Sequence, residues 1–152
     1  MHRRWHTAPV RIRPATTADA ASFVPLFAQW DHAQPAEMIA GRIDVFAATP
    51  HAELLVAELD GAVAGLAGVC AEPHLARPSL NARLMGLVVG DAFRRRGVGE
   101  ALVRAAEAIA RGWGCDRMEV TSSRRRAAAQ AFYPALGYEE QSTTRERFIR
   151  PL

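Results

Sequence analysis

A run of three arginines and two glycines, Arg94-Arg95-Arg96-Gly97-Val98-Gly99, stands where an apolar stretch gives way to the pattern of a helix. The glycines leave the main chain uncovered at the mouth of that helix, where unpaired N–H groups and the positive end of the helix dipole attract anions. The arginines add fork-shaped donors that suit phosphate. The spacing therefore predicts a phosphate or pyrophosphate site, held chiefly by main-chain amides.

Two common phosphate motifs do not fit this segment. A P-loop ends in a lysine followed by serine or threonine, and every one of the 19 basic residues here is arginine. A dinucleotide fingerprint needs a third glycine where Leu102 stands, and its first glycine directly follows a strand. Gly97 instead lies eight positions beyond Val89. The predicted anion site is therefore of another type.

The spacing of apolar residues and turn residues predicts the elements that position this site. Strands are expected at residues 10–13, 54–59, 62–71, 84–89 and 117–121, with a final pair of strands between Tyr138 and Arg150. Helices are expected from Thr17 or Asp19 to Trp30, from Pro35 to about Thr49, from Gly97 to about Arg111 and from Ala127 to Leu136. Asp60-Gly61 favours a two-residue hairpin turn, and Glu72 to Asn81, with its two prolines, is expected to be a loop.

This order of elements predicts an α/β (α+β) fold with a single mixed, mostly antiparallel sheet and helices on both of its faces. Residues 1–152 are expected to form one domain, with residues 1–9 as a flexible N-terminal extension. The length suffices for one core without disulfides or metals.

Composition narrows the class of protein. Hydrophobic residues make up 49% and charged residues 23% of the chain, which is the balance of a globular protein. The formal net charge of +3 is too small to favour a nucleic-acid-binding protein. Two cysteines are too few for a disulfide framework, and no segment is apolar enough for a signal sequence or a membrane span. We expect a cytoplasmic protein with neither a membrane nor a nucleic acid as its partner.

Two segments resemble the GNAT superfamily of N-acetyltransferases. Leu87 to Gly99 is similar to its acetyl-coenzyme A signature, an apolar strand followed by R/Q-x-x-G-x-G/A. Ala129 to Tyr138 is similar to its A-x-x-F-Y-x-x-x-G-F/Y motif, at the correct distance. The resemblance covers the chain from Val10 to Arg150. Within the superfamily, the segments 121–126 and 137–148 resemble aminoalkylphosphonate N-acetyltransferases.

The resemblance implies a transfer of acetyl from acetyl-CoA, as the cosubstrate, to a primary amine of a small molecule by direct attack in a ternary complex. It implies that an N–H near Val89 faces the acetyl oxygen, and that Tyr133 is the catalytic acid that protonates the departing sulfur. The cofactor residues implied in the same way are Leu87, Val88, Val89, Arg94, Arg95, Arg96, Gly97, Val98, Gly99 and Arg126. No metal is implied, and a homodimer is common among similar proteins.

The general base is left open. A glutamate that many relatives carry near Gly86 is missing, and Gln130 replaces a histidine that often precedes the Phe-Tyr pair. The remaining candidates lie in two predicted loops, or a water chain takes their place: Asp31, His32 and Glu37 between the first two helices, and Glu72 and His74 before the central strand. Cys115 is interpreted as a packing residue because no histidine partner lies near it in the sequence.

Two other functions remain open from the residues alone. The missing base is compatible with an acyl-CoA-binding sensor that has no catalytic activity. The arginine runs at 94–96 and 124–126 are compatible with a nucleic-acid-binding module, which leaves the glycine and Phe-Tyr spacings unexplained. The identity of the acceptor amine is not specified by the sequence.

Overall fold

The computed structural model describes residues 9–122, 127–141 and 147–152. The chain divides into two compact units, Met1–Val120 and Thr121–Leu152. The predicted Arg126 contact and the predicted extension at residues 1–8 lie outside the described residues.

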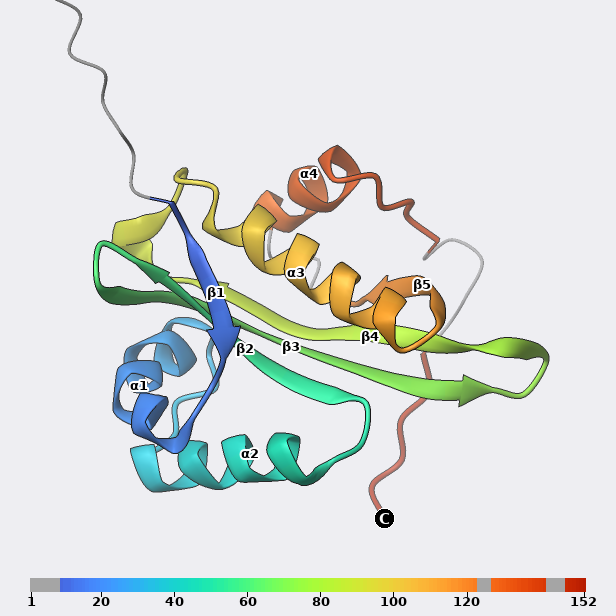
Figure 1. Ribbon diagram of the computed structural model, residues 1–152, viewed down its shortest axis with the longest axis horizontal. Coiled ribbons are helices and arrows are strands. Elements are labelled where there is room, and N and C mark those ends of the chain that lie inside the picture. The colour runs from blue at the N-terminus through green and yellow to red at the C-terminus, as the bar shows by residue number, and fades with distance from the viewer. Residues whose placement is uncertain (1–8, 123–126, 142–146) are drawn as a thin grey trace, which may run out of the picture. The chain divides into compact units, whose positions relative to one another are not determined.

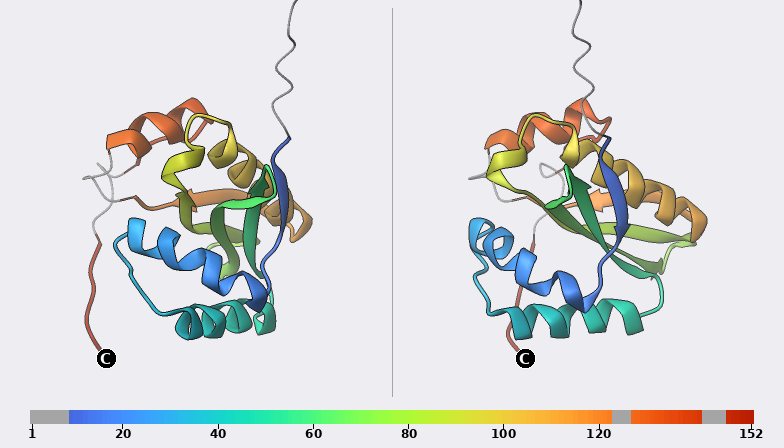
Figure 2. Two further views of the ribbon diagram at one scale, coloured as in Figure 1. Left: turned by 90° about the vertical axis from the view of Figure 1, so that its left-hand side faces the viewer. Right: turned by 60° about the vertical axis from the view of Figure 1, so that its left-hand side comes forward.

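The first unit is built on a five-stranded sheet in the order β1-β2-β3-β4-β5 (Figures 1 and 2). Neighbouring strands are antiparallel except for β4 and β5, which are parallel. The strands are β1 (Arg11–Pro14), β2 (Ala52–Leu59), β3 (Ala62–His74), β4 (Arg77–Val89) and β5 (Cys115–Val120). The helices are the 3-10 turns η1 (Thr17–Asp19) and η2 (Asp91–Phe93), and α1 (Ala20–Gln29), α2 (Ala36–Ala48) and α3 (Val98–Gly112). The predicted mixed, mostly antiparallel sheet is confirmed.

Helices cover both faces of this sheet, as predicted: α1 and α2 lie on one face and α3 on the other (Figure 1). Two glycines of β3 show why the helices come so close. A Cβ on Gly68 would lie 3.4 Å from the ring of Phe46 in α2, whereas one on Gly65 would lie 3.2 Å from Val98 in α3. Residues three apart on a strand point to opposite faces. Each helix therefore packs against bare backbone on its own side.

The core between the sheet and the first two helices is apolar and fully enclosed. Phe23 of α1 and Ile39 of α2 have no exposed surface, and Val56 of β2 is equally buried. Their spacing in each helix is the one from which the helices were predicted. The α3 face is enclosed in the same way by the buried side chains of Val98 and Leu102.

The predicted loop from Glu72 to Asn81 is wrong. β3 continues to His74 and β4 begins at Arg77, so that this segment forms the end of a long hairpin. The prolines are accommodated because a proline needs only a position without a ladder N–H. Pro73 lies beyond Cys70, where β2 no longer pairs with β3, and Pro78 lies before Leu80, where β5 begins to pair with β4.

The described part of the second unit contains the helix α4 (Ala127–Ala135), within the predicted bounds 127–136. The predicted final strands are not found in the described part of the tail: residues 138–141 and 147–152 have no regular structure. Residues 142–146, which belong to the same prediction, lie outside the described residues. The alternation in this tail was a short and weak signal, and alternation alone does not supply a neighbouring strand.

Candidate functional site

β4 loses its partner on one side halfway along its length. It pairs with β5 only from Leu80 to Leu84, whereas it pairs with β3 as far as Val89. The register against β3 slips between Leu84 and Gly86, which leaves Met85 as a bulge. A bulge bends its strand and increases the local twist. β4 therefore diverges from β5 and exposes an unpaired stretch, Met85–Val89, which we call the open edge.

The polar groups that face the open edge can be assigned from the ladder. The N–H of Gly90 donates to the carbonyl of Ala64 in β3 at 2.8 Å. Because main-chain groups alternate in direction along a strand, those of Leu87 and Val89 point away from β3. The open edge thus presents alternating donors and acceptors, as a strand or an extended amide chain requires. The side chains of Leu87 and Val89 are half-buried, and that of Val88 packs in the core with α1 and α2.

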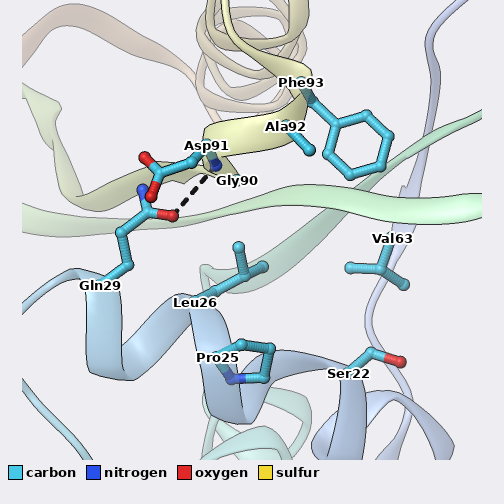
Figure 3. A pocket seen from close by; sticks show the side chains of 9 residues that line it. All are labelled: Ser22, Pro25, Leu26, Gln29, Val63, Gly90, Asp91, Ala92 and Phe93. Atoms are coloured by element: carbon cyan, nitrogen blue, oxygen red, sulfur yellow. Dashed lines mark hydrogen bonds between the residues drawn. The ribbon is translucent and has the colours of Figure 1, made fainter.

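Gln29, the last residue of α1, binds the end of the open edge. Its Nε2 donates to the Val89 carbonyl at 2.7 Å. Its Oε1 accepts from the Asp91 N–H at 3.1 Å, the bond drawn as a dashed line in Figure 3. Gln29 also lines a shallow pocket of about 190 Å³ beside η2. The other lining residues are Ser22, Pro25, Leu26, Val63, Gly90, Asp91, Ala92 and Phe93.

The turn that follows η2 leads into the N-terminus of α3. Gly97 is the N-cap and has φ +80°, a conformation that residues with a Cβ rarely adopt. Its own carbonyl accepts from Ala101 at 3.0 Å, but no side chain caps the helix. The N–H groups of Val98 and Gly99 therefore remain available to an anion. Val98 contributes only its backbone, because its side chain is 1% exposed and packs in the core.

The three arginines before Gly97 differ in their surroundings. Arg94 pairs with Asp91 at 2.7 Å, and Arg96 pairs with Asp60 at 2.7 Å. Arg95 is exposed, has φ +60° and forms no ion pair with any residue that the structure describes. Its guanidinium is therefore the one of the three that an incoming anion meets without first displacing a carboxylate.

Two aromatic side chains, Trp30 and His32, pack beside the open edge at Gly86. A Cβ on Gly86 would lie 2.9 Å from the indole of Trp30, so this ring packs directly against the backbone of the open edge. The His32 ring packs against Trp30 with a centroid distance of 4.4 Å. The loop after α1 thus brings His32, and with it Asp31, to the side of the open edge.

Two of the other proposed bases, Glu72 and His74, lie farther away. Glu72 pairs in register with Asn81, six residues before Leu87, which is roughly 20 Å along an extended strand. His74 pairs with Arg77 at the end of the hairpin, farther still. Glu37 lies in the first turn of α2. The structure therefore brings the loop after α1 to the open edge, and it separates Glu72 and His74 from it.

In the second unit, the end of α4 fixes the ring of Tyr133. The Tyr138 N–H donates to the Tyr133 carbonyl and the Gly137 N–H donates to the Pro134 carbonyl, both at 3.0 Å, and Gly137 has φ +97°. This is a Schellman motif. It brings the ring of Tyr138 to 5.7 Å from that of Tyr133, while Phe132 contacts the same ring at 5.0 Å. Burial raises the pKa of Tyr133, so its phenol stays protonated.

The two cysteines lie in surroundings that do not activate them as nucleophiles. Cys70 and Cys115 are free thiols, and burial raises the pKa of both, which disfavours the nucleophilic thiolate. The described residues contain no cluster of three or more histidine, cysteine or carboxylate side chains that could hold a metal ion. Across the same residues, no helix combines the length and apolarity that a membrane span needs.

Sequence reasoning missed Gln29 and the contact of Trp30 with Gly86. Nothing in the sequence marks Gln29, because its two hydrogen bonds join residues some sixty positions apart. Gly86 was a usable signal: a glycine inside the apolar run Leu84 to Val89 indicates a close approach by another group.

Comparison with known proteins identifies the family. The Acetyltransferase (GNAT) family matches residues 16–138. Aminoglycoside N(6')-acetyltransferase type 1 from Klebsiella aerogenes is 31% identical over 151 residues, which span 93% of this chain and 96% of that protein.

Solved structures show the same fold. The aminoglycoside N-acetyltransferase AAC(6')-Iy in complex with CoA superimposes with a TM-score of 0.82 at 23% identity, over 99% of each chain. A structure described as a transcriptional regulator from Bacillus halodurans C-125 has a TM-score of 0.83 at 25% identity, over 95% of this chain and 100% of that one.

The open edge of β4 beside the start of α3, together with these matches, defines an acyltransferase that uses a coenzyme A thioester. The chain belongs to the GNAT family of acetyltransferases. It is an acetyl-CoA-dependent N-acetyltransferase, with acetyl-CoA as its cosubstrate and an amine as the acceptor.

Proposed function

We propose that this enzyme acetylates a primary amine of a small molecule by direct attack within a ternary complex. The observation that carries the proposal is the open edge of β4 beside the uncapped start of α3. The edge offers main-chain amides to the arm of acetyl-CoA, and the N–H groups at 97–99 with Arg95 offer charge to its diphosphate. During the attack of the amine, negative charge collects on the carbonyl oxygen of the acetyl group. A main-chain N–H on the open edge, at Leu87 or Val89, stabilises this oxygen.

Tyr133 is the proposed acid. The ordinary pKa values of about 10 for tyrosine and 8.5 for a thiol make complete proton transfer to the sulfur uphill by roughly 2 kcal/mol. A hydrogen bond shared in the transition state is therefore favoured over a free phenolate. The raised pKa of Tyr133 supports this role, because it keeps the donor proton in place at neutral pH.

The proton of the amine leaves through the loop after α1. His32 and Asp31 adjoin the open edge through Trp30, and either accepts the proton directly or through a water. Glu72 and His74 are too far along the hairpin for this role.

The curated relative supports a proposal for the class of acceptor. Aminoglycoside N(6')-acetyltransferase, by its name, acetylates an amino group of an amino sugar. We propose an acceptor of the same kind, a polar small molecule that carries one or more primary amines. A homodimer without nucleic acid is the proposed assembly, and sedimentation at micromolar concentration measures it.

Thiol release from acetyl-CoA, measured with a panel of amines, tests the proposal. The panel contains aminoglycosides, aminophosphonates, polyamines and peptide N-termini. Turnover with aminoglycosides or aminophosphonates is the expected result. Binding of acetyl-CoA by calorimetry without turnover of any amine would instead support a sensor, and binding of a mixed oligonucleotide in place of acetyl-CoA would support the nucleic-acid module.

Tyr133→Phe tests the acid. We expect turnover to fall roughly 10²- to 10⁴-fold, because the proton donor is lost while the ring stays. The affinity for acetyl-CoA should be unchanged. Tyr138→Phe is the matched control, since it retains the ring that packs against Tyr133. Equal turnover of Tyr133→Phe and the wild type would remove Tyr133 from the mechanism.

A further inference from the structure

The open edge offers two places where a secondary amide can pair. In a parallel ladder, the N–H of one residue donates to a carbonyl and its C=O accepts from an N–H, and these two groups lie two residues apart on the neighbouring strand. The first place is formed by the Leu87 carbonyl and the Val89 N–H, to which the structure assigns no partner within the described residues. The second is formed by the Val89 carbonyl and the Asp91 N–H. The two places are two residues, or roughly 7 Å, apart.

Gln29 takes the second place in the ligand-free protein. Its carboxamide donates to the Val89 carbonyl and accepts from the Asp91 N–H, as one residue of a parallel neighbouring strand would do. β5 pairs with β4 only as far as Leu84. Beyond that residue, the Gln29 side chain supplies one pair of the hydrogen bonds that a parallel neighbour would make with β4. Main-chain groups at this end of the strand are satisfied without a ligand.

The arm of acetyl-CoA carries two secondary amides between its thioester and its diphosphate. An arm that runs from the start of α3 along β4 brings the amide nearer the thioester to the first place. Because the N–H and C=O of a trans secondary amide point in opposite directions, each amide offers one of the two to the open edge. The amide nearer the diphosphate then meets the Val89 carbonyl or the Asp91 N–H, both of which Gln29 holds.

We propose that Gln29 is a specificity-determining residue of the donor site, which occupies the second amide place and competes there with the distal amide of the carrier. The inference rests on the proposed function, in which the carrier pairs with the open edge. Pairing of the proximal amide is unaffected by Gln29, whereas pairing of the distal amide requires its side chain to leave. The pocket of about 190 Å³ that Gln29 lines with Ser22 and Pro25 gives the displaced side chain room (Figure 3).

Calorimetry with CoA tests the competition. Gln29→Ala should bind CoA about 3- to 10-fold more tightly than the wild type, the size expected from one or two net hydrogen bonds. Gln29→Met should behave in the same way, since it keeps the length of the side chain without its donor and acceptor. Ser22→Ala is the control, because Ser22 lines the same pocket and bonds to neither group of the second place.

Amide signals provide a readout that needs no turnover. In the ligand-free protein, the Asp91 N–H should exchange faster in Gln29→Ala than in the wild type. Titration with pantetheine, which has both amides, should be tighter in Gln29→Ala, and titration with N-acetylcysteamine, which has one, should be equal in the two proteins. Thermal unfolding checks that each variant is folded.

Three results would overturn the inference: unchanged or weaker CoA binding by folded Gln29→Ala and Gln29→Met, an equal gain with the one-amide probe, or unchanged exchange at Asp91. The weaker binding would make Gln29 a support of the strand end instead of a competitor. If the wild type binds no CoA at all, the proposed function fails, and the exchange at Asp91 still reports whether Gln29 holds the second place.

Discussion

At the scale of single residues, Arg95 carries the clearest electrostatic consequence. Its two neighbours are already paired with Asp91 and Asp60, while Arg95 has no carboxylate partner within the described residues. A charge without a partner is not already partly neutralised, so a phosphate gains the full attraction of its guanidinium.

Arg95→Ala should therefore weaken acetyl-CoA binding by about 3- to 30-fold and reduce the salt dependence of that binding. Calorimetry at low and at high salt measures both effects. Arg111→Ala, at the opposite end of α3, serves as the control. Equal affinity and equal salt dependence of Arg95→Ala and the wild type would place the diphosphate elsewhere.

Asp19 determines part of the acid stability. Arg13 donates to both of its carboxylate oxygens at 2.7 and 2.8 Å, and the Thr16 N–H donates at 2.8 Å. These bonds, with Arg13 as the main cause, lower the pKa of Asp19 below its usual value. A carboxyl with a lowered folded pKa stabilises the fold above its unfolded pKa of about 3.9, and that contribution is lost as the pH falls through the folded value.

Asp19→Asn should lower the free energy of unfolding by about 1 to 3 kcal/mol at neutral pH. It should also lose less stability than the wild type as the pH falls from about 5 to about 2. Urea unfolding across this range of pH tests both expectations. Asp44→Asn, on the exposed face of α2, is the control. Parallel pH profiles of Asp19→Asn and the wild type would contradict this account.

The residues of the site were predictable from the sequence to different degrees. The position of Gly97 and Gly99 at a helix start was predictable, because glycines before an amphipathic run are a local signature. That Arg95 stands apart from Arg94 and Arg96 was not predictable, because their partners Asp91 and Asp60 are brought close only by the fold. Gln29 was missed for the same reason.

At the scale of elements, Gly137 connects the end of α4 to the position of Tyr133. A φ of +97° is strained for any residue with a Cβ, at a cost of about 1 to 2 kcal/mol. If the Schellman motif opens, Tyr138 no longer holds its place against the ring of Tyr133.

Gly137→Ala should thus lower turnover more than it lowers the affinity for acetyl-CoA, and Gly137→Asn should lie between it and the wild type, because asparagine adopts this conformation more readily. Steady-state kinetics and calorimetry give the two numbers. Gly112→Ala, at a glycine with open space around it and no positive φ, is the control. Full turnover by Gly137→Ala would separate the motif from the position of Tyr133.

The long hairpin of β3 and β4 was not predictable, because the sequence does not show where the neighbouring strands end. Proline was read as a loop signal, which holds only where its missing N–H is needed. Pro73 and Pro78 occupy stretches of the hairpin that have lost a neighbour on one side, and this depends on where β2 and β5 stop. The helices were predicted well because their apolar spacing is local, as in Phe23, Leu26 and Phe27.

At the scale of the whole molecule, the sequence predicts one domain. The family match at residues 16–138 runs through the boundary between the two compact units, and the single domain stays a prediction. Fold class was predictable because the order of strands and helices admits few arrangements. The tail was not, because its alternation after Tyr138 specifies no partner strand.

A single domain should unfold in one transition, and acetyl-CoA should raise the temperature of that transition. At about a hundred times its dissociation constant, a ligand adds about 2.7 kcal/mol, or roughly 5 to 10 °C for a chain of this length. Calorimetric scans with and without acetyl-CoA test this, and hydrogen exchange of peptides from 9–120 and from 127–141 should slow together. Two separate transitions, or protection confined to one unit, would contradict a single domain.

The open edge also has a consequence for how the protein behaves in storage. Unpaired strand edges recruit strands from other chains and so promote aggregation. Here the stretch at risk is short, begins with a bulge at Met85 and ends where the Gln29 carboxamide covers it. The same features that shape the donor site thus leave little room for another copy to add a strand, and a bound thioester would cover what remains.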